Sequence, residues 1–194
     1  MNRNITIISV LIILFVIIPH EFVSGEETSE NKSFRKILKS ISRSKKKTLK
    51  FVETKVVHSL GLKLKSSGTY FFRSPQIFEK ITEYPSWERV LIEKNSMSIE
   101  NENGTDILYL QQHPSLRIVV NSIRSVFVGN LVSLRDAFEI KFLAHGEKWS
   151  FQLTPKPSDF EQAVQSVIFS GIRSHVSNIR INQFDGDEIL ISLQ

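Results

Sequence analysis

The sequence predicts an α+β fold in which a long, curved antiparallel sheet carries one or two helices over one face. Two observations predict the sheet. Most of the chain after residue 47 consists of short segments with period-two alternation, and Gly, Asn, Asp and Pro turns separate them. The third observation concerns the helices, because only a few stretches place apolar residues at helical spacing. Roughly nine to eleven strands are expected, and a sheet of that size has to curl.

The N-terminus has the pattern of an export signal. Arg3 supplies a short positive region, residues 5–18 form a 14-residue run that is almost entirely apolar, and Pro19 ends that run. We therefore expect a signal peptide over residues 1–25, cleaved after Gly25. The alternative is an uncleaved membrane anchor, which needs about 20 apolar residues, more than the run provides.

Beyond the signal we expect a flexible leader over residues 26–32 and a single domain over residues 33–194, which is long enough to bury a core. The first element of the domain is a helix over residues 34–41, where apolar residues recur at positions i, i+3, i+4 and i+7. Ser33 is its expected N-cap.

The net charge of +5 is concentrated in one segment. Residues 32–50 hold nine Lys or Arg and no Asp or Glu, whereas residues 51–194 hold 15 basic and 16 acidic residues. A nearly neutral body does not predict binding to nucleic acid. The basic segment suits transient contact with an anionic membrane surface or an acidic partner, and it equally suits a solvated helix face.

The strands are expected in chain order, with hairpin turns at residues 101–104 and 185–187. They are predicted over residues 48–57, 68–73, 77–82, 87–93, 97–100, 107–110, 139–144, 149–153, 164–169, 176–183 and 188–193. One interruption stands between the sixth and the seventh strand. Residues 116–130 have helical spacing and form the most apolar segment of the mature chain, and a second short helical piece follows over residues 131–138.

The sequence contains none of the local patterns of catalysis or metal binding that we considered. It has no cysteine, and its five histidines are scattered without the spacing of a metal site. It has no glycine-rich phosphate loop and no nucleophile elbow. Asp185, Asp187 and Glu188 cluster in a turn, where Asp is expected for backbone reasons. We therefore expect no enzyme activity, no cofactor and no metal.

Aromatic residues are the remaining feature. The chain has 14 phenylalanines, 12 of them after the expected signal, and many lie on predicted strands. They fit ordinary core packing. They also fit a lined cavity, because a single curved sheet has more apolar side chains than its own layers fill.

The order of these elements resembles the LolA family of outer-membrane lipoprotein carriers. Residues 51–55 are similar to that family's opening strand, and residues 68–80 to its glycine-led strand that ends in a basic-Pro corner. Residues 149–155 resemble its Trp-led strand, and residues 182–187 resemble a late hairpin. The resemblance spans about residues 34–194.

The resemblance implies an open, unclosed β-barrel with a helical lid over an apolar cavity. It implies a periplasmic, monomeric carrier that binds acyl chains of lipoprotein or lipid and exchanges them with membrane-bound donor and acceptor proteins during outer-membrane biogenesis, without a cofactor. The residues expected to line the cavity and lid are Phe51, Tyr70, Phe72, Phe78, Val119, Ile123, Phe127 and Phe151.

The sequence departs from the family at two positions. The family places an arginine directly before the corner proline, where it fastens the lid, whereas here Ser74 precedes Pro75 and Arg73 is one residue earlier. A one-residue offset on a strand turns a side chain to the opposite face. Lys80 replaces an aromatic residue, and the surrounding pattern is closer to a LolA-like branch associated with aryl-polyene and related envelope lipids.

Two other functions stay open from the sequence. The same sheet could be packed solid and serve as a periplasmic interaction domain that carries nothing. A hydrolase of envelope lipid or glycan would depend on the carboxylates near Asp185, because paired carboxylates can lie far apart in a sequence.

Overall fold

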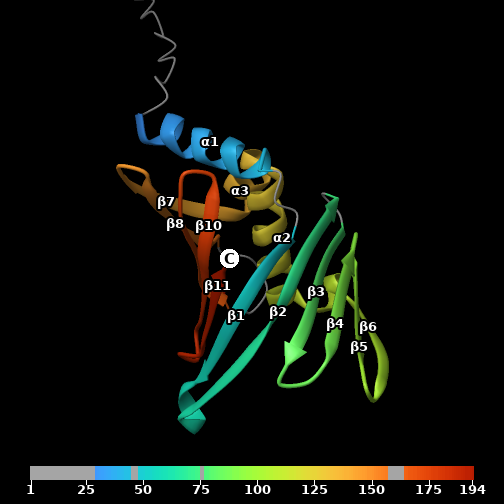
Figure 1. Ribbon diagram of the computed structural model, residues 1–194. Helices are drawn as coiled ribbons and strands as arrows, with labels where there is room; N and C mark the ends of the chain where they lie inside the picture. The colour runs from blue at the N-terminus through green and yellow to red at the C-terminus, as the bar shows by residue number, and fades with distance from the viewer. Residues whose placement is uncertain (1–28, 45–47, 75–76, 157–163) are drawn as a thin grey trace, which may run out of the picture.

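The computed structural model describes residues 29–44, 48–74, 77–156 and 164–194. Within these ranges the chain forms eleven strands, three α-helices and two short 3-10 helices. All strands belong to one antiparallel sheet, which curves around the helices (Figure 1). The predicted signal peptide (1–25) and the first residues of the predicted leader (26–28) lie outside the described residues.

The strands follow the hairpin order that the turns predict. They are β1 (Thr48–Val57), β2 (Leu62–Ser74), β3 (Ile77–Tyr84), β4 (Glu88–Glu93), β5 (Ser96–Asn101), β6 (Gly104–Tyr109), β7 (Phe138–His145), β8 (Lys148–Pro155), β9 (Val164–Ile172), β10 (His175–Gln183) and β11 (Glu188–Leu193). In space the order is β6-β5-β4-β3-β2-β1-β11-β10-β9-β8-β7, so the first and last strands are neighbours. No pairing joins β6 to β7 in the described part of the chain, and the curved sheet is therefore open, as the resemblance implies.

The helices connect to the sheet at its two edges. α2 (Pro114–Val128) and α3 (Leu131–Ala137) link edge strand β6 to edge strand β7, after the 3-10 helix η2 (Leu110–Gln112). Pro114 stands in the first turn of α2, where its missing N–H costs nothing. Gly129 ends α2 with a left-handed φ of 77°. The Asn130 side chain then caps α3 by accepting from the Ser133 N–H at 3.0 Å.

α1 (Ser29–Ser42) begins five residues earlier than the sequence predicts. Ser33 is therefore inside the helix and not its N-cap, and residues 29–32, expected in the leader, belong to α1. Two features explain the longer helix. Glu30 lies in the first turn, where a negative charge favours helix formation. The Asn31 side chain accepts a hydrogen bond from Arg135 of α3 at 3.0 Å, which ties the first turn to the domain.

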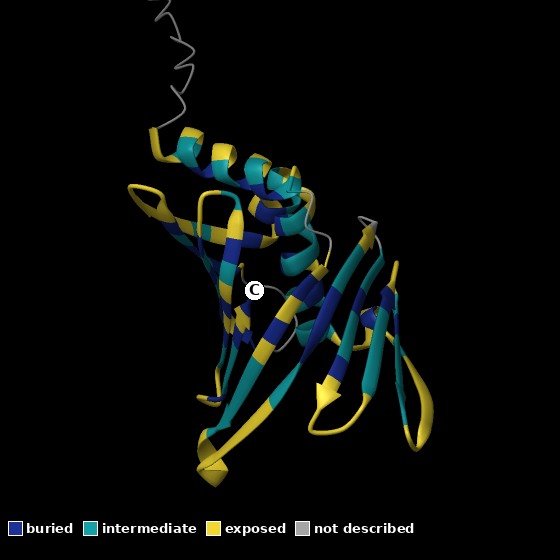
Figure 2. Cartoon of the chain, viewed as in Figure 1, coloured by how far each residue is buried: buried dark blue, intermediate teal, exposed yellow. Residues whose placement is uncertain are grey.

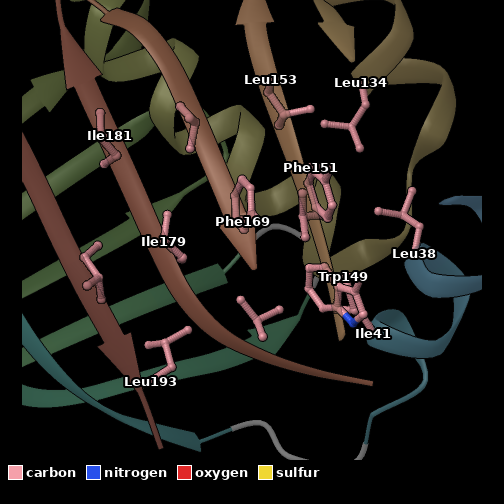
Figure 3. Packing of buried hydrophobic residues seen from close by; sticks show 14 of the residues in the cluster. Leu38, Ile41, Leu134, Trp149, Phe151, Leu153, Phe169, Ile179, Ile181 and Leu193 are labelled. Carbon is pink, nitrogen blue, oxygen red and sulfur yellow. The ribbon is translucent and has the colours of Figure 1, made fainter. Parts of the chain in front are cut away.

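The main core lies between α1, α2 and α3 and the part of the sheet formed by β7–β11, and it extends onto β1 and β2 (Figures 2 and 3). Phe34, Leu38 and Ile41 of α1 are buried against the concave face, so the helical spacing in the sequence identified this face correctly. Phe151 and Phe169 are stacked in the same core. A second, smaller core forms under α2 at the β4–β6 edge, from Ile92, Met97, Leu110 and Val120.

Candidate functional site

A cavity of about 280 Å³ lies between one end of the sheet and the helices. The last residues of α1, the start of β1, the ends of β2 and α2, and the β9–β10 hairpin surround it. Its lining is mainly apolar, with serines and basic side chains among the other residues. The lining residues are Ile41, Ser42, Ser44, Leu49, Phe72, Arg73, Phe78, Arg124, Phe127, Val128, Ser174, His175 and Val176.

A continuous row of aromatic rings connects the floor of the sheet to α2. Phe51 on β1 stacks on Tyr70 of β2 with ring centroids 4.5 Å apart, and Tyr70 contacts Phe78 of β3 at 5.1 Å. Phe78 contacts Phe72 at 5.0 Å, and Phe72 stacks on Phe127 of α2 at 4.2 Å. Strand alternation produces this row, because residues two apart on β2 face the same side and pair with the matching face of β3.

The eight residues that the sequence assigns to the cavity and lid occupy three environments. Phe72, Phe78 and Phe127 line the cavity itself. Phe51 and Tyr70 are buried below it and continue the aromatic row.

The other three predicted residues lie outside the cavity lining. Val119 and Ile123 on α2 are half-buried and pack against the main core. Phe151 is buried in a separate aromatic group, with ring contacts to Phe34, Trp149 and Phe169 beneath α1 (Figure 3). The structure does not place these three in the lining of the cavity.

Sequence reasoning missed part of the lining. Ile41 was assigned only to the buried face of its helix, and Leu49 and Val176 only to strands, yet all three line the cavity. Their position depends on how α1 and the β9–β10 hairpin meet above the sheet, which no local pattern in the sequence specifies.

Lys80 lies beside the aromatic row, next to Glu53 and Phe51. Its ammonium contacts the Glu53 carboxylate at 3.0 Å and lies 5.0 Å from the centroid of the Phe51 ring. A cation over an aromatic face is an attractive arrangement, so Lys80 still packs against the ring system. Burial, the charge of Glu53 and a hydrogen bond to that carboxylate raise the pKa of Tyr70 well above its ordinary value. Tyr70 therefore stays neutral.

Two arginines near the cavity have different surroundings. Arg124 of α2 donates from Nη1 to the carbonyl oxygen of Lys94 in the β4–β5 turn, and burial lowers its pKa. Arg73 directs its guanidinium to Glu79, with Nε and the carboxylate 2.8 Å apart. The bond of Arg73 is therefore to the sheet and not to α2.

The described residues contain no group of three His, Asp or Glu side chains that could hold a metal ion. Asp185 and Asp187, the carboxylates that a hydrolase would need, have backbone roles. Asp185 accepts from the N–H of Asp187, and Asp187 accepts from the N–H of His58, both at 2.9 Å. Among the helices described, none has the length and apolar character needed to cross a membrane.

Comparison with known proteins gives similar folds at low identity. Among solved structures, the chain is similar to a LolA superfamily protein from Nitrosomonas europaea, with 8% identity, 81% of this chain and 90% of that chain covered, and a TM-score of 0.44. It is similar to a DUF1329 family protein from Desulfovibrio piger, with 8% identity, coverage of 86% and 92%, and a TM-score of 0.44. It is also similar to the lipoprotein LppX from Mycobacterium tuberculosis, with 9% identity, coverage of 81% and 93%, and a TM-score of 0.42.

No family model and no curated protein matches the sequence.

Proposed function

We propose that this chain is a non-enzymatic periplasmic carrier, which binds acyl or other apolar chains of lipids or lipoproteins under α2 and moves them toward the outer membrane. The observation that supports this function best is the row of rings from Phe51 to Phe127, which ends in a cavity between sheet and helix. A carrier is needed because each exposed CH₂ group costs about 0.8 kcal/mol in water, so a long acyl chain needs a shield.

The size of the cavity places a condition on this function. Sites for drug-sized ligands enclose about 300–1,000 Å³, and the cavity here has about 280 Å³. In this proposal the arrangement is a closed state, in which Phe127, one of the lining residues, fills space that a long chain would occupy. Binding then requires α2 to move away from β2, which breaks side-chain packing but no strand pairing.

The proposal predicts that Phe127→Glu abolishes uptake of a fluorescent fatty acid while the sheet stays folded. The new carboxylate would stand beside Phe72 in an apolar lining, where an apolar ligand could not compensate for its lost hydration. Uptake is measured by fluorescence titration, and folding by circular dichroism. Val132→Glu is the matched control, because Val132 is an exposed apolar residue of α3 outside this cavity.

Native mass spectrometry of protein purified without detergent provides a second test. We expect a fraction of the wild-type protein to carry co-purified lipid, and Phe127→Glu to carry none. A clean ligand-free mass, combined with no uptake of the fatty acid by the wild type, would show that the protein is the solid interaction domain and not a carrier.

A further inference from the structure

The hairpin formed by β1 and β2 projects beyond the strands on either side of it (Figure 1). β1 pairs with β11 only as far as Val56, and β2 begins to pair with β3 only at Ser67. Residues 57–66, called the hairpin tip below, therefore lie outside the reach of both neighbouring strands. They include the 3-10 helix η1 (His58–Leu60) and a left-handed glycine, Gly61.

The hairpin tip exposes three leucines within five residues. Leu60, Leu62 and Leu64 are 68%, 47% and 55% exposed. Single exposed apolar residues are common on protein surfaces, but three adjacent ones at the end of a projecting ribbon form a contact surface. None of the three belongs to either hydrophobic core of the described chain, so the fold itself gives no reason for them.

The charge of the hairpin tip has one sign. Lys63 and Lys65 alternate with the leucines, Lys55 pairs opposite Leu64 on β1, and residues 57–66 contain no Asp or Glu. The carboxylate of Asp187, at the neighbouring β10–β11 turn, accepts a hydrogen bond from the His58 N–H at 2.9 Å. This bond ties the start of the tip to the β10–β11 turn.

Two aromatic residues lie next to the base of the hairpin tip. Tyr84 is the last residue of β3 and pairs with Ser67 of β2. Trp87 follows in the loop between β3 and β4. Both side chains are exposed. Tyr and Trp are the residues that collect at the boundary between lipid and water, because one end of each side chain is apolar and the other forms hydrogen bonds.

We propose that the hairpin tip is a docking site for the surface of an anionic lipid bilayer. Leu60, Leu62 and Leu64 enter the acyl region, and the lysines bind anionic headgroups. Strand alternation places Leu62 and Leu64 on the same side of β2 as Tyr70 and Phe72, so the docking surface continues into the face that carries the aromatic row. The docking site is separate from the cavity and does not depend on its occupancy.

Binding to vesicles tests the apolar part of the site. The probes are vesicles of equal parts phosphatidylglycerol and phosphatidylcholine, and vesicles of phosphatidylcholine alone, with bound protein measured by co-sedimentation. We expect the wild type to bind the anionic vesicles more strongly. Leu62→Ser with Leu64→Ser should reduce that binding about tenfold or more, because two leucines lose their burial in lipid. The matched control is Leu143→Ser with Val132→Ser, two residues exposed to 72% and 69% elsewhere, which should bind as the wild type does.

Charge reversal separates the hairpin tip from the basic helix. Lys63→Glu with Lys65→Glu should abolish the preference for anionic vesicles, whereas Lys36→Glu with Lys39→Glu, on the exposed side of α1, should leave most of it. The opposite result would overturn the proposal and assign membrane contact to residues 32–50. Failure of the wild type to bind either vesicle at low salt would also overturn it.

Tryptophan fluorescence gives an independent signal. The chain has two tryptophans, and Trp149 is buried in the core, so a change on adding vesicles reports on Trp87. We expect a blue shift with anionic vesicles that is absent in the Lys63→Glu, Lys65→Glu variant. Fatty-acid uptake without vesicles should be unchanged in all hairpin variants, which separates a failure of this inference from a failure of the carrier function.

Discussion

Glu79 is the most completely buried acidic residue described, with only 2% of its side chain exposed. It lies on β3 between two arginines, accepting from Nε of Arg73 at 2.8 Å and from Nε of Arg89 at 2.6 Å. Burial alone would raise the pKa of this carboxyl group. The hydrogen bonds and charges of Arg89 and Arg73 outweigh burial, and the pKa of Glu79 is lower than its ordinary value.

This arrangement predicts that Glu79→Gln destabilises the protein by about 1–3 kcal/mol at neutral pH, the cost of losing charge-assisted hydrogen bonds at a buried site. Because the folded-state pKa is lowered, the stability from Glu79 is present above its unfolded-state pKa and is lost as pH falls through the folded-state pKa. The difference between wild type and variant should therefore shrink in acid. Urea unfolding at about pH 7 and about pH 3 measures it.

Glu100→Gln is the control for this prediction. Glu100 contacts the same Arg89, but at 3.4 Å and with a far more exposed side chain, so its loss should cost less than about 1 kcal/mol. Equal effects of the two substitutions, or a Glu79→Gln effect that grows in acid, would contradict the assigned role.

The role of Glu79 could not be predicted from the sequence. Arg73 and its offset from the corner proline are visible there, but alternation does not keep Arg73 away from the cavity, which Arg73 and Phe72 both line. Which acidic residue Arg73 would meet depends on the register between β2 and β3, where the structure has a shift between Phe72 and Ser74. The register between two strands is fixed by packing across the sheet, so the residue pattern of one strand alone does not determine it.

At the scale of elements, Gly68 shows why β2 and β3 approach each other as they do. A Cβ added at this glycine would lie 2.0 Å from the carbonyl oxygen of Ile81. Gly68 also stands beside a register shift, where Ser67 pairs with Tyr84 and Gly68 with Thr82. The absent side chain therefore permits a local irregularity in the ladder.

Gly68→Ala should destabilise the protein by about 2–3 kcal/mol, because the clash is with backbone and β3 has to shift to relieve it. Thermal and urea unfolding measure the change. Ser66→Ala, on the same strand but only half-buried, is the matched control and should cost far less. A Gly68→Ala variant as stable as the wild type would show that the two strands can separate here at no cost.

Local patterns predicted the elements well and their boundaries less well. The strand over residues 48–57 is β1 itself, and the helix expected over residues 116–130 is found at Pro114–Val128. Hydrophobic periodicity and turn residues are local features, so they can be recognised in a single sequence. The predicted start of α1 was wrong because the first turn of the helix is held by a hydrogen bond from Arg135, which lies about a hundred positions further along the chain.

The cavity was predicted only in part, for a related reason. The sequence predicts which strands carry aromatic residues, but it does not predict how α2 crosses them. Phe127 meets Phe72, whereas Phe151 packs beneath α1. Both predictions rest on apolar periodicity, which identifies a buried face without saying what covers it.

At the scale of the whole molecule, helices and not strand pairing bridge the open side of the sheet. The chain leaves the sheet at β6, passes through α2 and α3, and re-enters at β7, and within the described residues no strand pairing joins the two free edges. β1 and β11 meet in the middle and hold the two halves together by hydrogen bonds. Side-chain packing and the hydrogen bond from Arg124 to the Lys94 carbonyl hold α2 in place, and the strand ladder does not. The proposed movement of α2 would therefore leave the strands paired.

This division predicts that the Phe127–Phe72 contact controls how fast the cavity fills. Phe127→Ala removes a ring that stacks on Phe72 at 4.2 Å in the lining of a cavity of about 280 Å³. It should lower the stability of the closed state by about 1–3 kcal/mol, less than for a fully buried Phe, because Phe127 is only half-buried. Uptake of a fluorescent fatty acid should become faster by about tenfold, since part of the closed packing is already lost.

Stopped-flow fluorescence measures this rate, with Val132→Ala as the control that should match the wild type. The substitutions at residue 127 should then have opposite effects on uptake. Phe127→Ala should make it faster by enlarging the cavity, and Phe127→Glu should abolish it by placing a charge in the apolar lining. If Phe127→Ala leaves the rate unchanged while Phe127→Glu abolishes uptake, the ring lines the cavity without holding it closed, and the rate is set by another part of α2. If both variants take up the probe as the wild type does, the chain enters elsewhere, and α2 is a fixed wall of the core and not a lid.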